Sequence, residues 1–146
     1  MVKKMAYILL ADDDIEDQEI LVEAILNLDA TVAIQSVQNG QEVLKYLEGC
    51  ADHELPALVV LDYKMPILSA ADVLERMNDR PRYGSIPKIV WSTSRQPEHI
   101  KLCMERGATH YFTKPVNLTE LTALATQILE IRGNSINTVD AQPQGI

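Results

Sequence analysis

Residues 8–17, with the sequence ILLADDDIED, place an apolar run directly before three consecutive aspartates, Asp12, Asp13 and Asp14. A nearly continuous apolar run is typical of a strand that is buried on both faces of a parallel sheet. Apolar residues at helical spacing follow over residues 14–28. The stretch therefore predicts a buried strand, a turn rich in carboxylates and then a helix.

The same alternation of strand and helix continues along the chain. The predicted strands are 5–11, 32–37, 57–61, 87–92 and 109–113, and the predicted helices are 14–28, 39–49, one that starts after Ser69, 97–107 and 117–133. This alternation predicts an α/β protein with a parallel sheet and helices on both faces. Because crossovers are right-handed, few topologies remain, and we expect a flavodoxin-like (βα)5 doubly wound sheet of five strands in the order 2-1-3-4-5.

Two of the predicted helices begin with a capping box. Asn39 is followed three residues later by Glu42, and Asn117 by Glu120. At this spacing the first residue caps the helix and the glutamate bonds back to it. We therefore expect both helices to start at these positions.

The chain has 146 residues, which is enough for one domain with a substantial core. The last predicted helix is expected to end at Gly133, because glycine commonly terminates helices. The residues after it are rich in Asn, Ser, Gln and Pro and show no periodicity. We predict one domain over residues 1–132 and a disordered tail over residues 133–146.

Composition narrows the class of protein. The net charge of −8 disfavours binding to nucleic acid. No stretch approaches the ~18 apolar residues of a membrane span, and the short apolar run after Lys3 and Lys4 has no cleavage site for a signal peptide. Cys50 and Cys103 lack paired spacing, so we expect reduced thiols in a cytoplasmic protein.

Polar residues follow four of the predicted strands. The first strand leads into Asp12, Asp13 and Asp14, and the others end at Asp62, at Ser92 with Thr93, and at Lys114. Active chemistry in such sheets gathers at the carboxyl ends of the strands, so we expect these side chains to meet. Neighbouring carboxylates repel by ~1 to 4 kcal/mol per pair. A divalent cation removes that cost, and an all-oxygen site suits Mg²⁺.

The strand-end residues together indicate phosphoryl chemistry, because a metal held by two carboxylates, a hydroxyl and a lysine is the equipment for handling a phosphoryl group. Asp14 has a simpler interpretation. Acidic residues in the first turn of a helix are favoured by the helix dipole, and Asp14 with Asp17 could form the cap.

The segments LLADDD, VVLDYKMP, IVWSTS and YFTKP, in this order and spacing, resemble the receiver domain of two-component response regulators. The resemblance covers residues 5–132 and is closest to the stand-alone type that serves sensor kinases and phytochromes. It implies that Asp62 accepts a phosphoryl group from a histidine kinase or a histidine phosphotransfer protein. A receiver is a signalling protein that catalyses only its own phosphoryl transfer and dephosphorylation.

The resemblance also implies a magnesium site. Asp13 and Asp62 would bind Mg²⁺ directly, and the backbone carbonyl of Lys64 would be a third ligand from the protein. Asp12 would act mainly through water.

Four further positions match residues of the receiver family. Ser92 matches the switch hydroxyl, and Thr93 the small residue after it. Lys114 matches the lysine that pairs with the phosphoryl group, and Pro115 the following proline, whose peptide bond is usually cis. Tyr111 matches the aromatic residue that changes rotamer on activation.

Two positions in the family tune the lifetime of the phosphoryl group, and they correspond to Lys64 and Ser94. We expect Lys64 to lengthen that lifetime. The output surface is expected on the face formed by the fourth helix, the fifth strand and the fifth helix, which also supports homodimers in relatives.

The sequence departs from the family pattern after the Met-Pro pair. Most receivers have glycine where Ile67 stands and another in place of Ala70. A β-branched side chain does not easily adopt a positive φ, so we expect a different turn in this loop.

Two alternatives remain at this point. In the first, Asp12, Asp14, Glu16 and Glu23 occupy positions one, three, five and twelve of a calcium-binding EF-hand loop. However, Asp17 replaces the glycine at position six, and a strand pattern precedes the loop where a helix is required.

The second alternative is a phosphatase of the haloacid dehalogenase type. ILLADDDI fits the D-x-D motif of those enzymes, and IVWST with Lys114 fits their later motifs. They also need an acidic metal-binding pair at a strand end after the lysine. Only Glu120, Glu130 and Asp140 follow Lys114, in a helix and in the tail.

Overall fold

The computed structural model describes residues 6–141, with side chains from residue 6 to residue 136. Strands and helices alternate along the chain, with two short 3-10 helices between them. The elements are β1(Ile8–Ala11), α1(Ile15–Leu28), β2(Ile34–Val37), α2(Gly40–Gly49), η1(Asp52–Glu54), β3(Leu58–Asp62), α3(Ala70–Asn78), η2(Pro81–Tyr83), β4(Lys88–Ser92), α4(Pro97–Glu105), β5(His110–Thr113) and α5(Leu118–Ala141).

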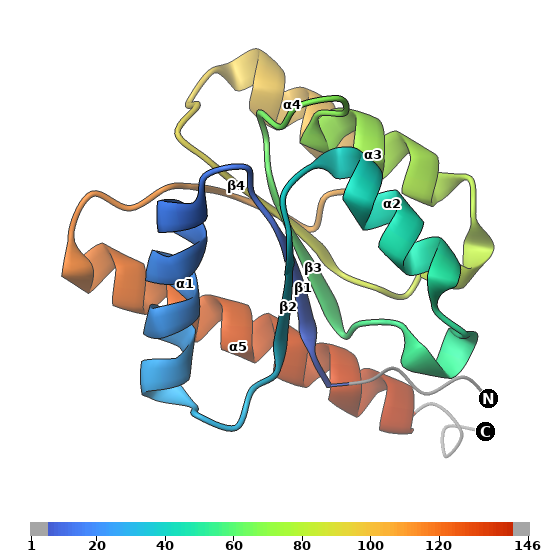
Figure 1. Ribbon diagram of the computed structural model, residues 1–146, viewed down its shortest axis with the longest axis horizontal. Coiled ribbons are helices and arrows are strands. Elements are labelled where there is room, and N and C mark those ends of the chain that lie inside the picture. Colours follow the sequence, from blue (N-terminus) through green and yellow to red (C-terminus); the bar gives the residue numbers. More distant parts are fainter. Residues whose placement is uncertain (1–5, 142–146) are drawn as a thin grey trace.

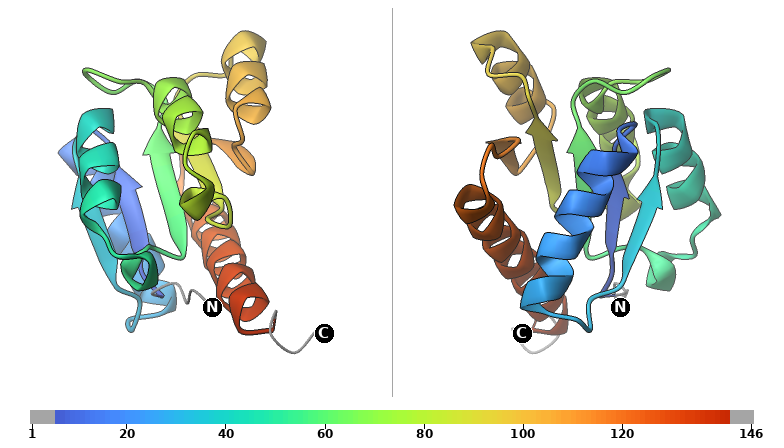
Figure 2. Two further views of the ribbon diagram at one scale, coloured as in Figure 1. Left: turned by 90° about the vertical axis from the view of Figure 1, so that its right-hand side faces the viewer. Right: turned by 60° about the vertical axis from the view of Figure 1, so that its left-hand side comes forward.

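The five strands form one parallel sheet in the order β2-β1-β3-β4-β5. This confirms the predicted fold class and strand order. Helices α1 and α5 lie side by side on one face, and α2, α3 and α4 cover the other (Figures 1 and 2). β1 lies between β2 and β3, so its buried residues contact helices on both sides of the sheet.

The core is divided by the sheet into two clusters. In β1, Leu9 and Ala11 belong to the cluster under α2, α3 and α4, whereas Ile8 and Leu10 belong to the one under α1 and α5. All four side chains are buried. Burying a large aliphatic side chain stabilises the fold by about 1.5–3 kcal/mol, which explains why the run before the aspartates is continuously apolar.

Asn39 and Asn117 cap α2 and α5 as predicted, but neither forms a complete capping box, because each glutamate bonds to the amide of the residue before the cap, Gln38 or Val116. The amide of Glu42 donates to the Asn39 side chain at 2.8 Å, and the Glu42 carboxylate accepts from the amide of Gln38. The amide of Glu120 donates to the Asn117 side chain at 2.8 Å. Satisfying these amides stabilises each helix by about 1 kcal/mol and fixes its first residue.

The sequence predicted that the last helix ends at Gly133, but α5 continues to Ala141. A glycine costs a helix only about 1 kcal/mol, and an added Cβ at Gly133 would meet nothing within 4 Å. Arg132 donates a hydrogen bond from Nε to the carbonyl of Ala6 at 2.7 Å, which ties this part of α5 to the chain before β1. The disordered-tail prediction is therefore wrong up to Ala141. Residues 142–146 lie outside the described residues.

Ile67 has a φ of 73°, so the expectation that it avoids this region is wrong. The amide of Leu68 donates to the carbonyl of Pro66 at 2.8 Å, which closes a three-residue turn around Ile67. The side chain is 67% exposed, so packing does not compensate for the unfavourable backbone. The turn lets the chain reverse after Asp62, and the amide of Ala70 then bonds to the carbonyl of Tyr63 at 3.0 Å.

The loop between β3 and α3 packs closely against the start of α2. A Cβ added at Gly40 would lie 2.5 Å from the carbonyl oxygen of Leu68 and 2.8 Å from a methyl carbon of Val73. Real Cβ atoms essentially never approach this closely. Glycine is therefore required at position 40 by a close approach of two segments.

Candidate functional site

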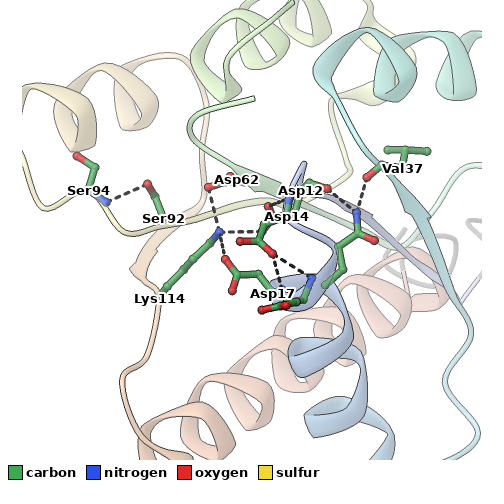
Figure 3. Close-up of polar contacts among 10 residues, drawn as sticks. Asp12, Asp14, Asp17, Val37, Asp62, Ser92, Ser94 and Lys114 are labelled. Carbon is green, nitrogen blue, oxygen red and sulfur yellow. Dashed lines mark hydrogen bonds and ion pairs between the residues drawn. The ribbon is translucent and has the colours of Figure 1, made fainter. Parts of the chain in front are cut away.

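Four strand ends bring their polar residues to one edge of the sheet. Asp12 follows β1, Asp62 ends β3, Ser92 ends β4 and Lys114 follows β5 (Figure 3). Asp62 and Trp91 are register partners on β3 and β4, which places Ser92 one residue beyond Asp62 along the sheet. The grouping predicted from the strand ends is therefore observed.

Asp12, Asp13 and Asp62 form an acidic cluster in which carboxylate oxygens lie within 4.8 Å of one another. Asp12 and Asp62 are buried, and Asp13 is exposed. Converging carboxylate oxygens are the ligands that Mg²⁺ and other hard cations prefer, so these donors fit a divalent ion. The expected contribution of the Lys64 carbonyl stays a prediction.

Lys114 lies between carboxylates from three elements. Its Nζ is 2.8 Å from Asp12, 2.7 Å from Asp17 and 3.5 Å from Asp62, and its side chain is only 10% exposed. Burial alone would lower the pKa of Lys114, but hydrogen bonds to Asp12 and Asp17 outweigh it and raise the pKa above its usual value. Lys114 is therefore a permanently charged ammonium at neutral pH.

The carboxyl group of Asp62 is unusually basic. Burial is the largest cause, and the neighbouring charge of Asp12 adds to it, so that the pKa of Asp62 rises to about 7 even though Lys114 opposes the shift. Burial also raises the pKa of Asp12, against hydrogen bonds from Lys114 and the amide of Asp14. A cation bound between them favours the charged forms of both.

Asp14 does not belong to the acidic cluster. It caps α1, where its carboxylate accepts hydrogen bonds from the amides of Glu16 and Asp17 at 3.0 and 3.2 Å. This confirms Asp14 as the cap. The helix begins at Ile15 and continues past Glu23, so the twelve-residue loop of an EF-hand is absent and the calcium-binding alternative is wrong.

Sequence reasoning missed Gln18 and assigned Asp17 to the helix cap. The side-chain amide of Gln18 is buried and donates to the carbonyls of Asp12 at 2.5 Å and Val37 at 2.8 Å, which joins α1 to the ends of β1 and β2. A glutamine on the otherwise apolar buried face of α1 was the available signal. Asp17, one residue earlier, pairs with Lys114 from the first turn of α1.

Ser92 is buried, and its hydroxyl accepts a hydrogen bond from the amide of Ser94 at 3.1 Å (Figure 3). Its carbonyl accepts a 2.7 Å hydrogen bond from the amide of Lys114. Ser92 thus connects the end of β4 with the residue that follows β5. Thr93 is exposed.

The loop after Ser92 is held by contacts of Ser94 with the side chains of His99 and Tyr111. The Ser94 hydroxyl is 2.6 Å from Nδ1 of His99, and the Ser94 carbonyl accepts from the Tyr111 hydroxyl at 2.9 Å. The His99 ring stacks on Tyr63 with centroids 4.3 Å apart. Nothing in the local sequence pattern around His99 signals this contact.

The peptide bond before Pro115 differs from the expectation. No peptide bond between residues 6 and 141 is cis, so the Lys114–Pro115 bond is trans. The trans isomer is favoured by about 0.5–1 kcal/mol for an ordinary bond before proline.

The family model of the response regulator receiver domain matches residues 8–126 of the chain. The protein belongs to this family. The match covers all four strand-end motifs. The chain is therefore assigned to the receiver family and not to the phosphatases of the haloacid dehalogenase type. The protein is thus a receiver of the two-component signalling type.

Relatives of this receiver are found among plant response regulators. It is 26% identical to the response regulator ORR12 of Oryza sativa over 84% of this chain and 97% of that protein. It is also 26% identical to ARR8 of Arabidopsis thaliana, over 86% of this chain but only 62% of that protein. The receiver therefore spans less than two thirds of some relatives and nearly the whole of others.

Solved structures agree with the fold of the receiver. The phosphorylated cyanobacterial phytochrome response regulator RcpA has a TM-score of 0.76 at 28% identity, over 89% of this chain and 93% of that one. RPA3017, a response regulator in red light signalling of R. palustris, has a TM-score of 0.74 at 26% identity, over 84% and 91%. The Mn²⁺-bound response regulator Rcp1 has a TM-score of 0.69 at 24% identity, over 84% and 90%, and shows the fold alone.

Within residues 6–136, no helix is both long enough and apolar enough to cross a bilayer.

Proposed function

We propose that the receiver accepts a phosphoryl group on Asp62 from a histidine kinase or a histidine phosphotransfer protein. The observation that carries this proposal is the position of Asp62, which is buried at the end of β3, belongs to the acidic cluster and lies 3.5 Å from Lys114. Asp13, Asp62 and the carbonyl of Lys64 would hold Mg²⁺ directly, and Asp12 through water.

The transfer uses Asp62 as a carboxylate nucleophile. One of its oxygens forms a bond to phosphorus while the phosphorus–nitrogen bond of the donor histidine breaks and returns its electron pair to the imidazole. Asp62 must be ionised for this step, and its pKa of about 7 leaves a large charged fraction at neutral pH. The nearby ammonium of Lys114 favours that charged form.

Charge on the phosphoryl oxygens is stabilised from three directions. When bound, Mg²⁺ would neutralise the carboxylates and stabilise charge on the transferred group. Lys114 would donate to one phosphoryl oxygen. The hydroxyl of Ser92 would turn from Ser94 toward another, which breaks its present bond to the Ser94 amide.

The signal would leave the site through the face formed by α4, β5 and α5. Ser92 and Lys114 stand at the ends of β4 and β5, and Tyr111 on β5 is hydrogen-bonded to the loop that follows Ser92. Rotation of Ser92 would therefore release this loop and let Tyr111 turn inward. A preference of a few kcal/mol shifts such a two-state surface, and we propose that phosphorylated receivers pair through it.

The proposed partner is a sensor histidine kinase or a histidine phosphotransfer protein, and we propose a cytoplasmic location for the receiver. RcpA is a phytochrome response regulator and RPA3017 acts in red light signalling, so phytochrome-type histidine kinases are the first donors to test. A phosphotransfer profile against every histidine kinase of the source organism identifies the donor.

Phosphorylation of Asp62 is tested with acetyl phosphate and Mg²⁺. Intact-mass measurement should show one added phosphoryl group on the wild type and none on Asp62→Asn. Asp14→Asn is the matched control, because it changes an aspartate that caps α1 outside the cluster and should be phosphorylated normally. Equal incorporation in Asp62→Asn would remove Asp62 from its proposed role.

The output surface is tested by amide exchange with and without phosphorylation. Protection should change across residues 92–122, and sedimentation should show more dimer in the phosphorylated sample. Changes confined to residues 12–14 and 62–70 would argue against a switch at this face.

Lys64 and Ser94 are proposed to tune the lifetime of the phosphoryl group. Lys64 is exposed two residues after Asp62, where its side chain can hinder the attacking water. Ser94 is already engaged with His99. Lys64→Ala should lose phosphate faster than the wild type, and an unchanged rate would contradict this role.

A further inference from the structure

Lys114 has more carboxylate partners than its proposed function requires. Pairing with a phosphoryl group calls for an ammonium beside Asp62, yet the two short contacts of Nζ are with Asp12 and Asp17, at 2.8 and 2.7 Å (Figure 3). The distance to Asp62 is 3.5 Å. Charge-assisted hydrogen bonds are strong at 2.7–2.9 Å and weaken beyond, so the ammonium is bound mainly on the α1 side of the site.

Asp17 differs from the other two partners of Lys114. Asp12 and Asp62 belong to the acidic cluster, whereas Asp17 lies in the first turn of α1 and is not part of it. Its carboxylate is 31% exposed, and within residues 6–136 Lys114 is the only ion-pair partner that the structure gives it. Its role at the site is therefore to bind Lys114.

We propose that Asp17 is a positioning residue that holds Lys114 on the α1 side of the unphosphorylated receiver and competes with the phosphoryl group for it. This inference rests on the proposed function of Asp62. An ammonium has three N–H donors, and two are engaged by Asp12 and Asp17. Because Nζ lies 3.5 Å from Asp62, a short bond from the remaining N–H to a phosphoryl oxygen on Asp62 requires the ammonium to move and to weaken its bond to Asp12 or Asp17, and Asp17 is the partner at the solvent edge.

The competition predicts how Asp17 affects the reaction. As long as Asp17 retains the ammonium, both the transfer to Asp62 and the phosphorylated state are less favourable. Removing its charge should therefore raise the rate of phosphorylation and the fraction phosphorylated at equilibrium. An acidic residue that served only the helix dipole would have neither effect, because Asp14 already caps α1.

The test compares Asp17→Asn with Glu16→Gln. Glu16 lies in the same first turn, is exposed and has no ion pair with Lys114, so its variant removes the same charge from the helix start. With acetyl phosphate and saturating Mg²⁺, we expect Asp17→Asn to be phosphorylated at least threefold faster than the wild type and Glu16→Gln to remain within a factor of 1.5. Urea denaturation should show that both variants are folded.

A double-mutant cycle with Lys114→Ala separates competition for Lys114 from a general charge effect. In the Lys114→Ala background, Asp17→Asn should no longer change the rate. An equal acceleration in both backgrounds, or slower phosphorylation of Asp17→Asn alone, would overturn the inference while leaving the role of Asp62 intact. If the wild type takes up no phosphoryl group, the proposed function fails, and the inference with it.

Discussion

Asp62 is held in an environment that acts against its charged form. Its side chain is buried and lies beside Asp12, and the nearest compensating charge is 3.5 Å away on Lys114. The same features that raise its pKa to about 7 make the site costly to fold without a cation. Function and stability therefore conflict at this residue.

Asp62→Asn should stabilise the metal-free protein, and more so at high pH. Between pH 4 and 7 the folded state holds a proton on Asp62 that the unfolded chain, with a pKa near 3.9, has lost. Stability contributed by this group therefore falls as the pH rises through that window. Urea denaturation in EDTA should show a gain for Asp62→Asn that is about 1–3 kcal/mol larger at pH 8 than at pH 5. A gain that is independent of pH would contradict the raised pKa.

Ile67 stores backbone strain in the loop after Asp62. A β-branched residue with a φ of 73° costs about 1–3 kcal/mol, and its exposed side chain recovers little of this. Ile67→Gly should therefore raise the free energy of unfolding by about 1 kcal/mol in urea denaturation. Ile67→Ala is the control, because it retains a Cβ and should gain much less. Equal effects of the two variants would locate the gain in lost apolar exposure and not in the backbone.

At the scale of elements, α5 continues through Gly133, although the sequence pattern predicts that the helix ends at this glycine. Gly133 lies within the helix, and an added Cβ would meet open space. Gly107, by contrast, follows the end of α4 and has a φ of 101°. A Cβ added to it would lie 3.0 Å from the side-chain oxygen of Asn78. The two glycines have the same letter in the sequence and opposite roles in the fold.

Gly133→Ala should stabilise the protein by about 0.5–1 kcal/mol, because alanine favours the helix interior and meets no steric obstacle. Gly107→Ala should destabilise it, because L residues rarely adopt its φ. Thermal or urea unfolding of both variants provides the measurement. Destabilisation by Gly133→Ala would indicate that α5 ends at residue 133 after all.

The polar residues at the strand ends could be predicted because the sequence pattern that marks them is local. Asp12, Asp62, Ser92 and Lys114 each follow an apolar run, and the parallel sheet then brings them together without further information. The cap at Asp14 follows from the same kind of local rule. These predictions needed only the period of the apolar pattern and the direction of the strands.

Other features depend on contacts between distant segments and could not be predicted. Asp17 and Lys114 are 97 residues apart, and the pairing depends on how α1 lies over the end of the sheet. The stacking of His99 on Tyr63 requires the same kind of knowledge about α4. The turn at Ile67 violates the local preference of its own residue, so a local rule predicts the opposite.

At the scale of the whole molecule, the site and the core form one unit. A single sheet supports both apolar clusters, and the acidic cluster sits on the ends of the strands that these clusters bury. A ligand that binds the folded cluster therefore stabilises the entire domain.

Mg²⁺ should raise the free energy of unfolding by about 1.4 kcal/mol at a concentration of ten times its dissociation constant. The increase should vanish in Asp13→Ala, which removes an exposed carboxylate of the cluster, and persist in Asp14→Asn. Thermal unfolding with and without Mg²⁺ measures both. A wild type whose unfolding does not respond to Mg²⁺ would show that the cluster binds no cation in this range.

A substitution of Gly40 could be mistaken for a mutation of the functional site itself. Any side chain at this position would push on Leu68 and displace the loop that begins just after Asp62. In a genetic screen, such a variant would show the same loss of response as a variant of the phosphorylation site, although every strand-end residue is unchanged. Second-site revertants should then map to residues 66–70, where the loop can move aside, and not to the carboxylates themselves.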